Sequence, residues 1–321
     1  MNDVFIHSFL SMGEALLRIF LIVVLAGALV RKKIISQEQI TGLSKITVIV
    51  LLPALVVSNT LQHFNPDALP YWWLIPLLGI AMSLVGVLLG YLVFATDYRK
   101  HKNLIAIASM QNAGYLVLPI AQVLYPENFH RFALYIFLFI LGYNPILWTL
   151  GKYLVTDTDA QVKFDYKSLI TPPAVANVAS LLLVLLGWQH IFPKTFVGAV
   201  DLLGQAAVPM ATFILGATLG TVSLKRLPKL WQLIRTLGVK YLLLPILTMA
   251  ILQYFHLGQT HPLLADFFII QAAAAPATGL ILQVRTYGGD TEKVSATMLV
   301  AYLFCLIALP FWLAYWHGVV V

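Results

Sequence analysis

Apolar runs follow one another along this chain, separated by short polar segments. Ten of these runs are long enough to cross a bilayer, since a transmembrane helix needs about 20 residues. The predicted spans are 8–30, 39–61, 72–95, 104–125, 130–151, 171–189, 197–222, 233–254, 264–284 and 295–316. The pattern predicts an all-α integral membrane protein with ten transmembrane helices, five on either side of a central loop.

Two of the apolar runs are interrupted by polar residues and proline. The fourth reads "MQNAGYLVLPIAQVLYP", in which Gln111 and Asn112 precede Pro119, and the ninth contains "AAAAPAT" around Pro276. Lipid offers no partner to a freed backbone amide or carbonyl, so an interruption at this depth has to be satisfied by protein or by a ligand. A simple proline kink is the alternative interpretation.

Matching positions in the two halves indicate an internal duplication. Pro53 and Pro209 are 156 residues apart, and Pro119 and Pro276 are 157 residues apart. Because each half has an odd number of spans, the second half must be inverted relative to the first. The predicted units are a first five-helix repeat at 1–151, a cytoplasmic connecting loop at 152–170 and an inverted repeat at 171–321. In transporters built this way, interrupted helices at matching positions mark the binding site, and their N-termini hold anions.

Composition and charge support this class and exclude others. Of the 321 residues, 60% are hydrophobic and 10% are charged, whereas a soluble domain carries about 25% charged residues. The net charge of +7 is not gathered in one basic stripe, so we expect no nucleic-acid partner. The sequence shows no metal-binding or enzyme motif. We therefore expect no catalytic residues, no metal and no cofactor.

Positive charges orient the predicted spans. Lys and Arg are concentrated in the odd-numbered connections, whereas the even-numbered ones carry only Arg131 and Lys194. Because cytoplasmic loops are enriched in Lys and Arg, the odd-numbered connections are expected in the cytoplasm. Both termini should then lie outside the cytoplasm, in a protein of the bacterial inner membrane.

Three motifs together resemble the auxin efflux carrier family across essentially the whole chain. They are "MQNAGYLVLPI", "AAVPMATFILGATLG" and "AAAAPATGLILQVRTYGGD", the last followed by "LIALPFW". The bacterial members of that family include malate and malonate permeases. The resemblance implies two inverted five-helix repeats, a scaffold formed by the first two helices of each half, and a mobile domain in which broken spans 4 and 9 cross. It also implies an organic anion as substrate.

The candidate substrate-binding residues lie in and around the two breaks. They are Asn112, Gly114, Tyr115, Pro119, Asn144, Gln271, Pro276, Thr278 and Gly279. The resemblance places Asn112 on the family's motif. Simpler roles are open for several of them, because Asn112 can cap a freed backbone group, Thr278 can bond to its own helix and Asn144 can join two helices.

Two charged residues occupy equivalent places in the halves. Lys45 and Asp201 each lie eight residues before a matched proline, Pro53 or Pro209. Charged residues within spans favour a functional role by default, which here is a scaffold ion pair or a part in coupling. The alternative is that both lie near a membrane surface, where a long side chain reaches water.

The predicted function is secondary-active or potential-driven transport of small organic anions, mono- or dicarboxylates, by alternating access. Two alternatives stay open: a sodium-coupled symporter of the bile-acid type, and a receptor that binds its ligand without moving it. Neither break contains Asp or Glu, which disfavours sodium. The expected partners are the anion and the lipid bilayer, and association into a homodimer is left open.

Overall fold

The computed structural model describes residues 2–156, 169–222 and 227–320, and every regular element in these ranges is helical. The helices of the first half are α1 (Asn2–Arg31), α2 (Gln37–Ile46), α3 (Leu52–His63), α4 (Leu74–Val93), α5 (Lys102–Ser109), α6 (Val117–Leu124), α7 (Phe129–Ile146) and α8 (Lys152–Val155). Those of the second half are α9 (Pro172–Leu185), α10 (Lys194–Gln205), α11 (Ala207–Gly220), α12 (Leu230–Gly238), α13 (Leu244–Tyr254), α14 (Leu257–Thr260), α15 (Pro262–Ala273), α16 (Gly279–Tyr287) and α17 (Thr291–Val320).

Seven continuous stretches of the described chain are long and apolar enough to cross a membrane. They are Phe5–Arg31, Gln37–His63, Leu74–Val93, Pro126–Val155, Lys194–Gly220, Leu230–Tyr254 and Thr291–Gly318. The other three predicted spans correspond to α9, which has only 14 residues, and to the interrupted pairs α5–α6 and α15–α16. The structure therefore shows an all-helical, multi-pass membrane protein with seven continuous spans where the sequence predicted ten spans.

The predicted connecting loop at 152–170 begins later than expected. Helix α8 continues through Val155, and α9 begins at Pro172, where the Thr171 side chain accepts a hydrogen bond from Ala174 N. Residues 157–168, which make up most of the predicted loop, lie outside the described part of the chain.

A π-helical turn interrupts three of the spans, and in two of them a proline follows the turn. The turns Thr47–Leu51 and Val239–Leu243 each end two residues before a proline, Pro53 or Pro245. Proline has no amide N–H and its ring clashes with the preceding turn, so the regular hydrogen-bond ladder cannot continue through it. In the span Leu230–Tyr254, Pro245 has no N–H to donate to Tyr241 O, and this carbonyl accepts a hydrogen bond from Trp312 Nε1 at 2.7 Å.

The surface and the core divide as expected for a protein in lipid. Along α1, Leu16, Ile19 and Val23 are buried, whereas Leu17 and Leu21 are exposed. The deepest core lies around α5, α7, α15 and α17. The Phe267 ring, for example, meets the rings of Phe132 and Phe139 edge-on, with centroids 5.6 Å apart in both cases. Large exposed apolar side chains on outward-facing helices need lipid around them.

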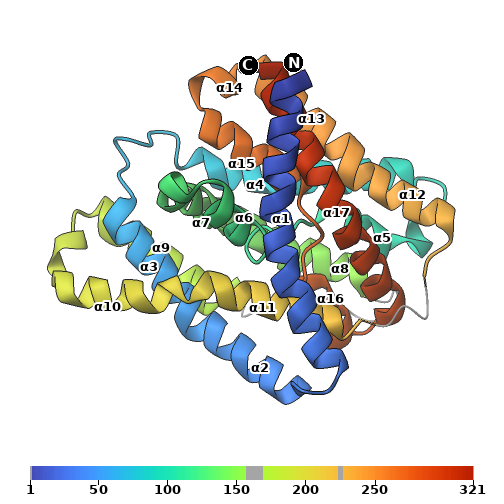
Figure 1. Cartoon of the computed structure of the whole chain (residues 1–321), viewed down its shortest axis with the longest axis horizontal. Helices are drawn as coiled ribbons and strands as arrows, with labels where there is room; N and C mark the ends of the chain where they lie inside the picture. Colours follow the sequence, from blue (N-terminus) through green and yellow to red (C-terminus); the bar gives the residue numbers. More distant parts are fainter. Residues whose placement is uncertain (1, 157–168, 223–226, 321) are drawn as a thin grey trace.

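Helix α1 packs directly against α11 and α17 (Figure 1). Small residues allow the α1–α11 backbones to approach very closely. A Cβ atom added to Gly220 would lie 2.6 Å from Gly27 Cα, and one added to Gly216 would overlap the backbone of Val23. The start of α1 and the end of α17 lie at the same end of the molecule (Figure 1).

Candidate functional site

The two interrupted helices meet at their interruptions. Asn112 N donates a hydrogen bond to Ala275 O at 2.7 Å, and Ala277 N donates to Met110 O at 3.0 Å. Gln111 and Pro276 thereby form an isolated antiparallel bridge. Each interrupted segment thus provides hydrogen-bond partners for some backbone groups of the other. Non-helical backbone within a membrane needs such partners, because lipid provides none.

Side chains from elsewhere in the chain hold this crossing together. Asn112 Nδ2 donates to Tyr302 Oη at 2.7 Å, and Tyr302 Oη donates to Pro276 O at 2.9 Å. Tyr143 Oη donates to Gln111 O at 2.5 Å. The side chain of Asn112 therefore connects the first break to α17, and through Tyr302 to the second break.

Tyr143 and Tyr302 are absent from the residues predicted from the sequence. Both are buried, at 2% and 0% exposure. The sequence did contain an indication of both residues, because a tyrosine hydroxyl in an otherwise apolar span needs a polar partner. Which partner it would find, 190 residues away in the case of Tyr302 and Asn112, required the fold.

Several backbone amides at the starts of α6 and α16 are left without an acceptor. The N–H groups of Gly114, Tyr115 and Leu116 donate to no described residue, and neither do those of Thr278 and Gly279. These amides belong to the first turns of two helices, or to the residues just before them. Unpaired N–H groups at a helix N-terminus, together with the helix dipole, favour a negatively charged ligand.

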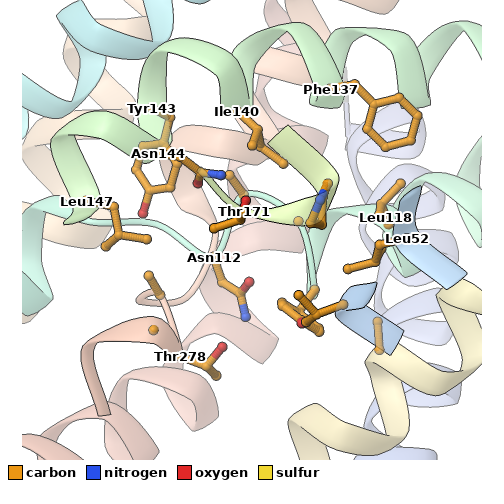
Figure 2. Close-up of a pocket in the computed structure, with 18 of the residues that line it drawn as sticks. Leu52, Asn112, Leu118, Phe137, Ile140, Tyr143, Asn144, Leu147, Thr171 and Thr278 are labelled. Atoms are coloured by element: carbon orange, nitrogen blue, oxygen red, sulfur yellow. The ribbon is translucent and has the colours of Figure 1, made fainter. Parts of the chain in front are cut away.

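A pocket of about 190 Å³ lies beside the crossing (Figure 2). One side is formed by the breaks and by α7, including Asn112, Asn144 and Thr278. The facing side is formed by α3, α9 and α11, including Leu52 and Asn177. No described residue that lines the pocket is charged. Polar character therefore comes from amide and hydroxyl side chains and from the backbone.

Six of the nine predicted substrate-binding residues line this pocket. They are Asn112, Gly114, Tyr115, Asn144, Thr278 and Gly279. Gln271 and Pro276 instead support the crossing behind it: Gln271 Nε2 donates to Ala113 O at 3.3 Å, and Pro276 O accepts from Tyr302. The structure thus brings together residues from both halves of the chain.

Pro119 has a different place from the one predicted. The helix is interrupted over residues 110–116, and Pro119 is the third residue of α6, buried and outside the pocket lining. Proline is accommodated in the first turn of a helix, because its ring meets no preceding helical turn there. Pro119 therefore belongs to the start of a helix rather than to the break.

Lys45 and Asp201 do not form the ion pair considered from the sequence. Lys45 is exposed on α2, whereas the Asp201 carboxylate accepts a hydrogen bond from Gln205 at 2.9 Å and acts electrostatically on His63. His63 ends α3, 18 residues after Lys45, which is about 27 Å along a helix axis. Lys45 therefore lies near one end of the span Gln37–His63, whereas Asp201, on α10, lies near the other end of that span.

One further buried charge was missed. Lys240 lies inside the predicted span 233–254, yet it was not among the candidate residues. Its side chain is 1% exposed. A charged residue at that depth is by itself a signal of function.

Comparison with known proteins identifies the family. The model of a family described as membrane transport protein matches residues 11–165 and again residues 158–313. The chain belongs to this family of membrane transporters. The family expected from the motifs is thus confirmed, and each match covers about one half of the chain, as the proposed duplication requires.

The curated relatives of this transporter are distant but cover most of its length. Protein PIN-LIKES 1 of Arabidopsis thaliana is 22% identical, over 96% of this chain and 81% of that protein. An uncharacterised transporter of Methanocaldococcus jannaschii is 20% identical, over 87% of this chain and 90% of that protein. Protein PIN-LIKES 7 of Arabidopsis thaliana is 21% identical, over 87% and 89%.

Proposed function

We propose that this transporter carries small organic anions, mono- or dicarboxylates, across a bacterial cytoplasmic membrane. The observation that carries the proposal is the set of unpaired backbone amides at the starts of α6 and α16, beside a pocket lined by residues of both breaks. A carboxylate accepts several N–H groups at once, and the two helix N-termini offer them without a buried cation.

The size of the pocket supports a small substrate. Its volume of about 190 Å³ is below the roughly 300–1,000 Å³ of sites for drug-sized ligands. Besides Asn112, the lining includes two asparagines, Asn144 on α7 beside the breaks and Asn177 on α9 on the facing side. Asn177 Nδ2 is already bonded to Phe137 O at 2.6 Å, so Asn144 is the better placed of the two to contact a bound anion.

The proposed architecture is ten spans in two inverted repeats. Counting α9 and the two interrupted pairs with the seven continuous stretches gives ten crossings, and the neighbouring ends of α1 and α17 (Figure 1) suit an even number. The Lys and Arg distribution then places both ends outside the cytoplasm.

The pocket itself supports alternating access. Its wall comes from two groups of helices: α3, α9 and α11 on one side, and α7 with the breaks on the other. In the proposed mechanism the second group moves against the first, which carries the anion across. One charge moving through 100 mV is worth about 2.3 kcal/mol, so the membrane potential alone is a sufficient drive for export.

The decisive experiment is uptake of labelled carboxylates by purified protein in liposomes. A panel of acetate, lactate, malonate and malate covers mono- and dicarboxylates, and protein-free liposomes control for leakage. We expect saturable uptake of at least one anion. Binding without flux would instead identify a receptor, and neither binding nor flux would refute the proposal.

The same preparation tests the sodium-coupled alternative. No described pocket residue is acidic, and hard cations such as sodium prefer oxygen ligands that include carboxylates. Uptake should therefore persist when choline replaces sodium. Loss of uptake in choline would favour the symporter.

A further inference from the structure

Lys240 lies near the middle of the membrane without a partner. It is 1% exposed, and its Nζ atom has no hydrogen-bond partner among the described residues. Lys240 is ten residues after Leu230, the first residue of a 25-residue span. Ten residues of helix are about 15 Å, half of a hydrocarbon core of about 30 Å. A lysine at that depth cannot reach water by extending its side chain.

The surroundings of Lys240 connect it to both breaks. It lies in the π-helical turn Val239–Leu243, which packs against α4, α5 and α15. Helices α5 and α15 are the two that end at the breaks. The thiol of Cys305 on α17 lies near Lys240 and donates a hydrogen bond to Ala273 O, the last residue of α15. Lys240 does not line the pocket, so it lies behind the crossing.

The ionisable groups of the neighbouring elements do not provide a counter-charge in this conformation. They are Tyr91 on α4, Lys102 on α5, Asp266 on α15, Arg235 on α12, Tyr241 beside Lys240, Tyr254 on α13, and Glu292, Lys293, Tyr302, Cys305, Tyr315 and His317 on α17. Asp266 is bonded to Tyr125 and His317, at 2.9 and 3.0 Å. Cys305 lies near Lys240, but a buried thiol is neutral and supplies no negative charge.

An ammonium group has three N–H donors and needs acceptors for them. Burying it without acceptors or a counter-charge is so unfavourable that the group releases its proton instead. The conformation seen here therefore favours the neutral amine. Acceptors lie elsewhere at the crossing, because the side-chain oxygens of Gln111 and Gln271 are buried and have no partner among the described residues.

We propose that Lys240 is a membrane-embedded proton-binding site that couples proton movement to anion transport. A proton from water adds to the lone pair of the amine, forming one N–H bond and one positive charge, and leaves again in the conformation seen here. The ammonium supplies the positive charge that the pocket lining lacks, so proton and anion binding favour each other. The resulting process is symport of a proton with the anion, and it rests on the proposed transport function.

Titration of the folded protein tests the site without any substrate. Unfolding should take up one proton at Lys240 in the wild type but none in Lys240→Met. Because the unfolded state then binds more protons, wild-type stability should rise with pH relative to the variant, by up to tenfold in the unfolding equilibrium per pH unit, until the pH reaches the ordinary pKa of lysine. Lys45→Met, which removes an exposed lysine, should follow the wild type. Parallel curves for the wild type and Lys240→Met would show that the amine stays protonated, and would overturn the proposal.

Proton flux in liposomes tests the coupling. With the potential clamped by potassium and valinomycin, an inward malonate gradient should acidify the lumen of wild-type vesicles beyond the protein-free control. Lys240→Met should exchange labelled malonate for unlabelled malonate but move no protons. Malonate uptake without proton movement in the wild type would overturn this inference and leave the proposed function standing. If no carboxylate of the panel moves, the proposed function fails, and the titration still decides whether Lys240 binds a proton.

Discussion

The two breaks look alike in the backbone but contribute differently to the pocket. The first spans residues 110–116 and places five consecutive residues in the lining, Gln111 to Tyr115. The second spans residues 274–278 and, with the first residue of α16, places Ala277, Thr278 and Gly279 there. The first break thus offers an asparagine and a tyrosine side chain, whereas the second offers mainly small residues and backbone.

The two breaks therefore have different roles in a pocket whose described lining carries no charge. Asn112 both lines the pocket and reaches Tyr302, so the first break fixes the geometry of the crossing. The second break lies against it and exposes amides at the start of α16. If this division is correct, side-chain changes should matter most in the first break, and changes that block the backbone should matter most in the second.

The largest effect is expected for Asn112→Ala. The substitution removes a polar pocket group and leaves Tyr302 with one partner fewer. Loss of a hydrogen bond to a charged ligand costs about 1.5–3 kcal/mol, which corresponds to a roughly ten- to hundredfold weaker affinity. Affinity for a transported carboxylate, measured on purified protein, checks this. Asn59→Ala is the matched control, since Asn59 is buried and hydrogen-bonded to His130 but does not line the pocket. If Asn112→Ala and Asn59→Ala bind the carboxylate with the same affinity, Asn112 does not belong to the substrate site.

Tyr302→Phe should weaken both breaks together. It leaves Asn112 Nδ2 and Pro276 O without their partner, and an unsatisfied buried group costs about 1–3 kcal/mol. We expect a lower free energy of unfolding in detergent and about tenfold weaker substrate affinity. Tyr254→Phe, at an exposed tyrosine, provides the comparison. A wild-type affinity in Tyr302→Phe would mean that the crossing keeps its geometry without this hydroxyl.

Gly279→Ala should weaken binding without unfolding the protein. An added Cβ would meet Leu147 at 3.5 Å, an ordinary contact, so the methyl group fits but occupies space beside the free amides. One methyl group in a tight site is worth about 1–3 kcal/mol, or about tenfold and more in affinity. Gly42→Ala, where an added Cβ meets nothing within 4 Å, controls for the change itself. An unchanged affinity would argue that the second break does not bind the substrate.

The smallest effect is expected for Pro119→Ala. Pro119 lies in the first turn of α6, a position at which helices accommodate proline. The helix already begins two residues earlier, so alanine should leave both the break and the pocket unchanged. Substrate affinity should stay within about twofold of the wild type, corresponding to less than about 0.5 kcal/mol, the usual range for neutral substitutions. A tenfold loss of affinity would instead indicate that Pro119 causes the break.

Much of the fold and part of the site could be predicted from the sequence. The breaks were predictable because polar residues beside proline cannot continue a helix in lipid without partners. The continuous length of each helix was harder to predict; α9, for example, ends after 14 residues. The hydrogen bonds of Tyr143 and Tyr302 could not be predicted, since they depend on which helices lie beside the crossing. The separation of Lys45 and Asp201 is what the proposed inversion of the second half would produce, since inversion exchanges the two ends of equivalent spans.

The glycine contact between α1 and α11 has a mechanical consequence. Packed side chains can change rotamer and let two helices slide, but backbones in direct contact have no such freedom. The close contact at Gly27, Gly216 and Gly220 therefore makes α1 and α11 a rigid helix pair. We therefore expect α1 and α11 to move as one unit, whereas α3 presents the larger side chains of Leu52 and Val56 to the pocket. Relative motion should therefore occur beside α3, along the pocket, and not between α1 and α11.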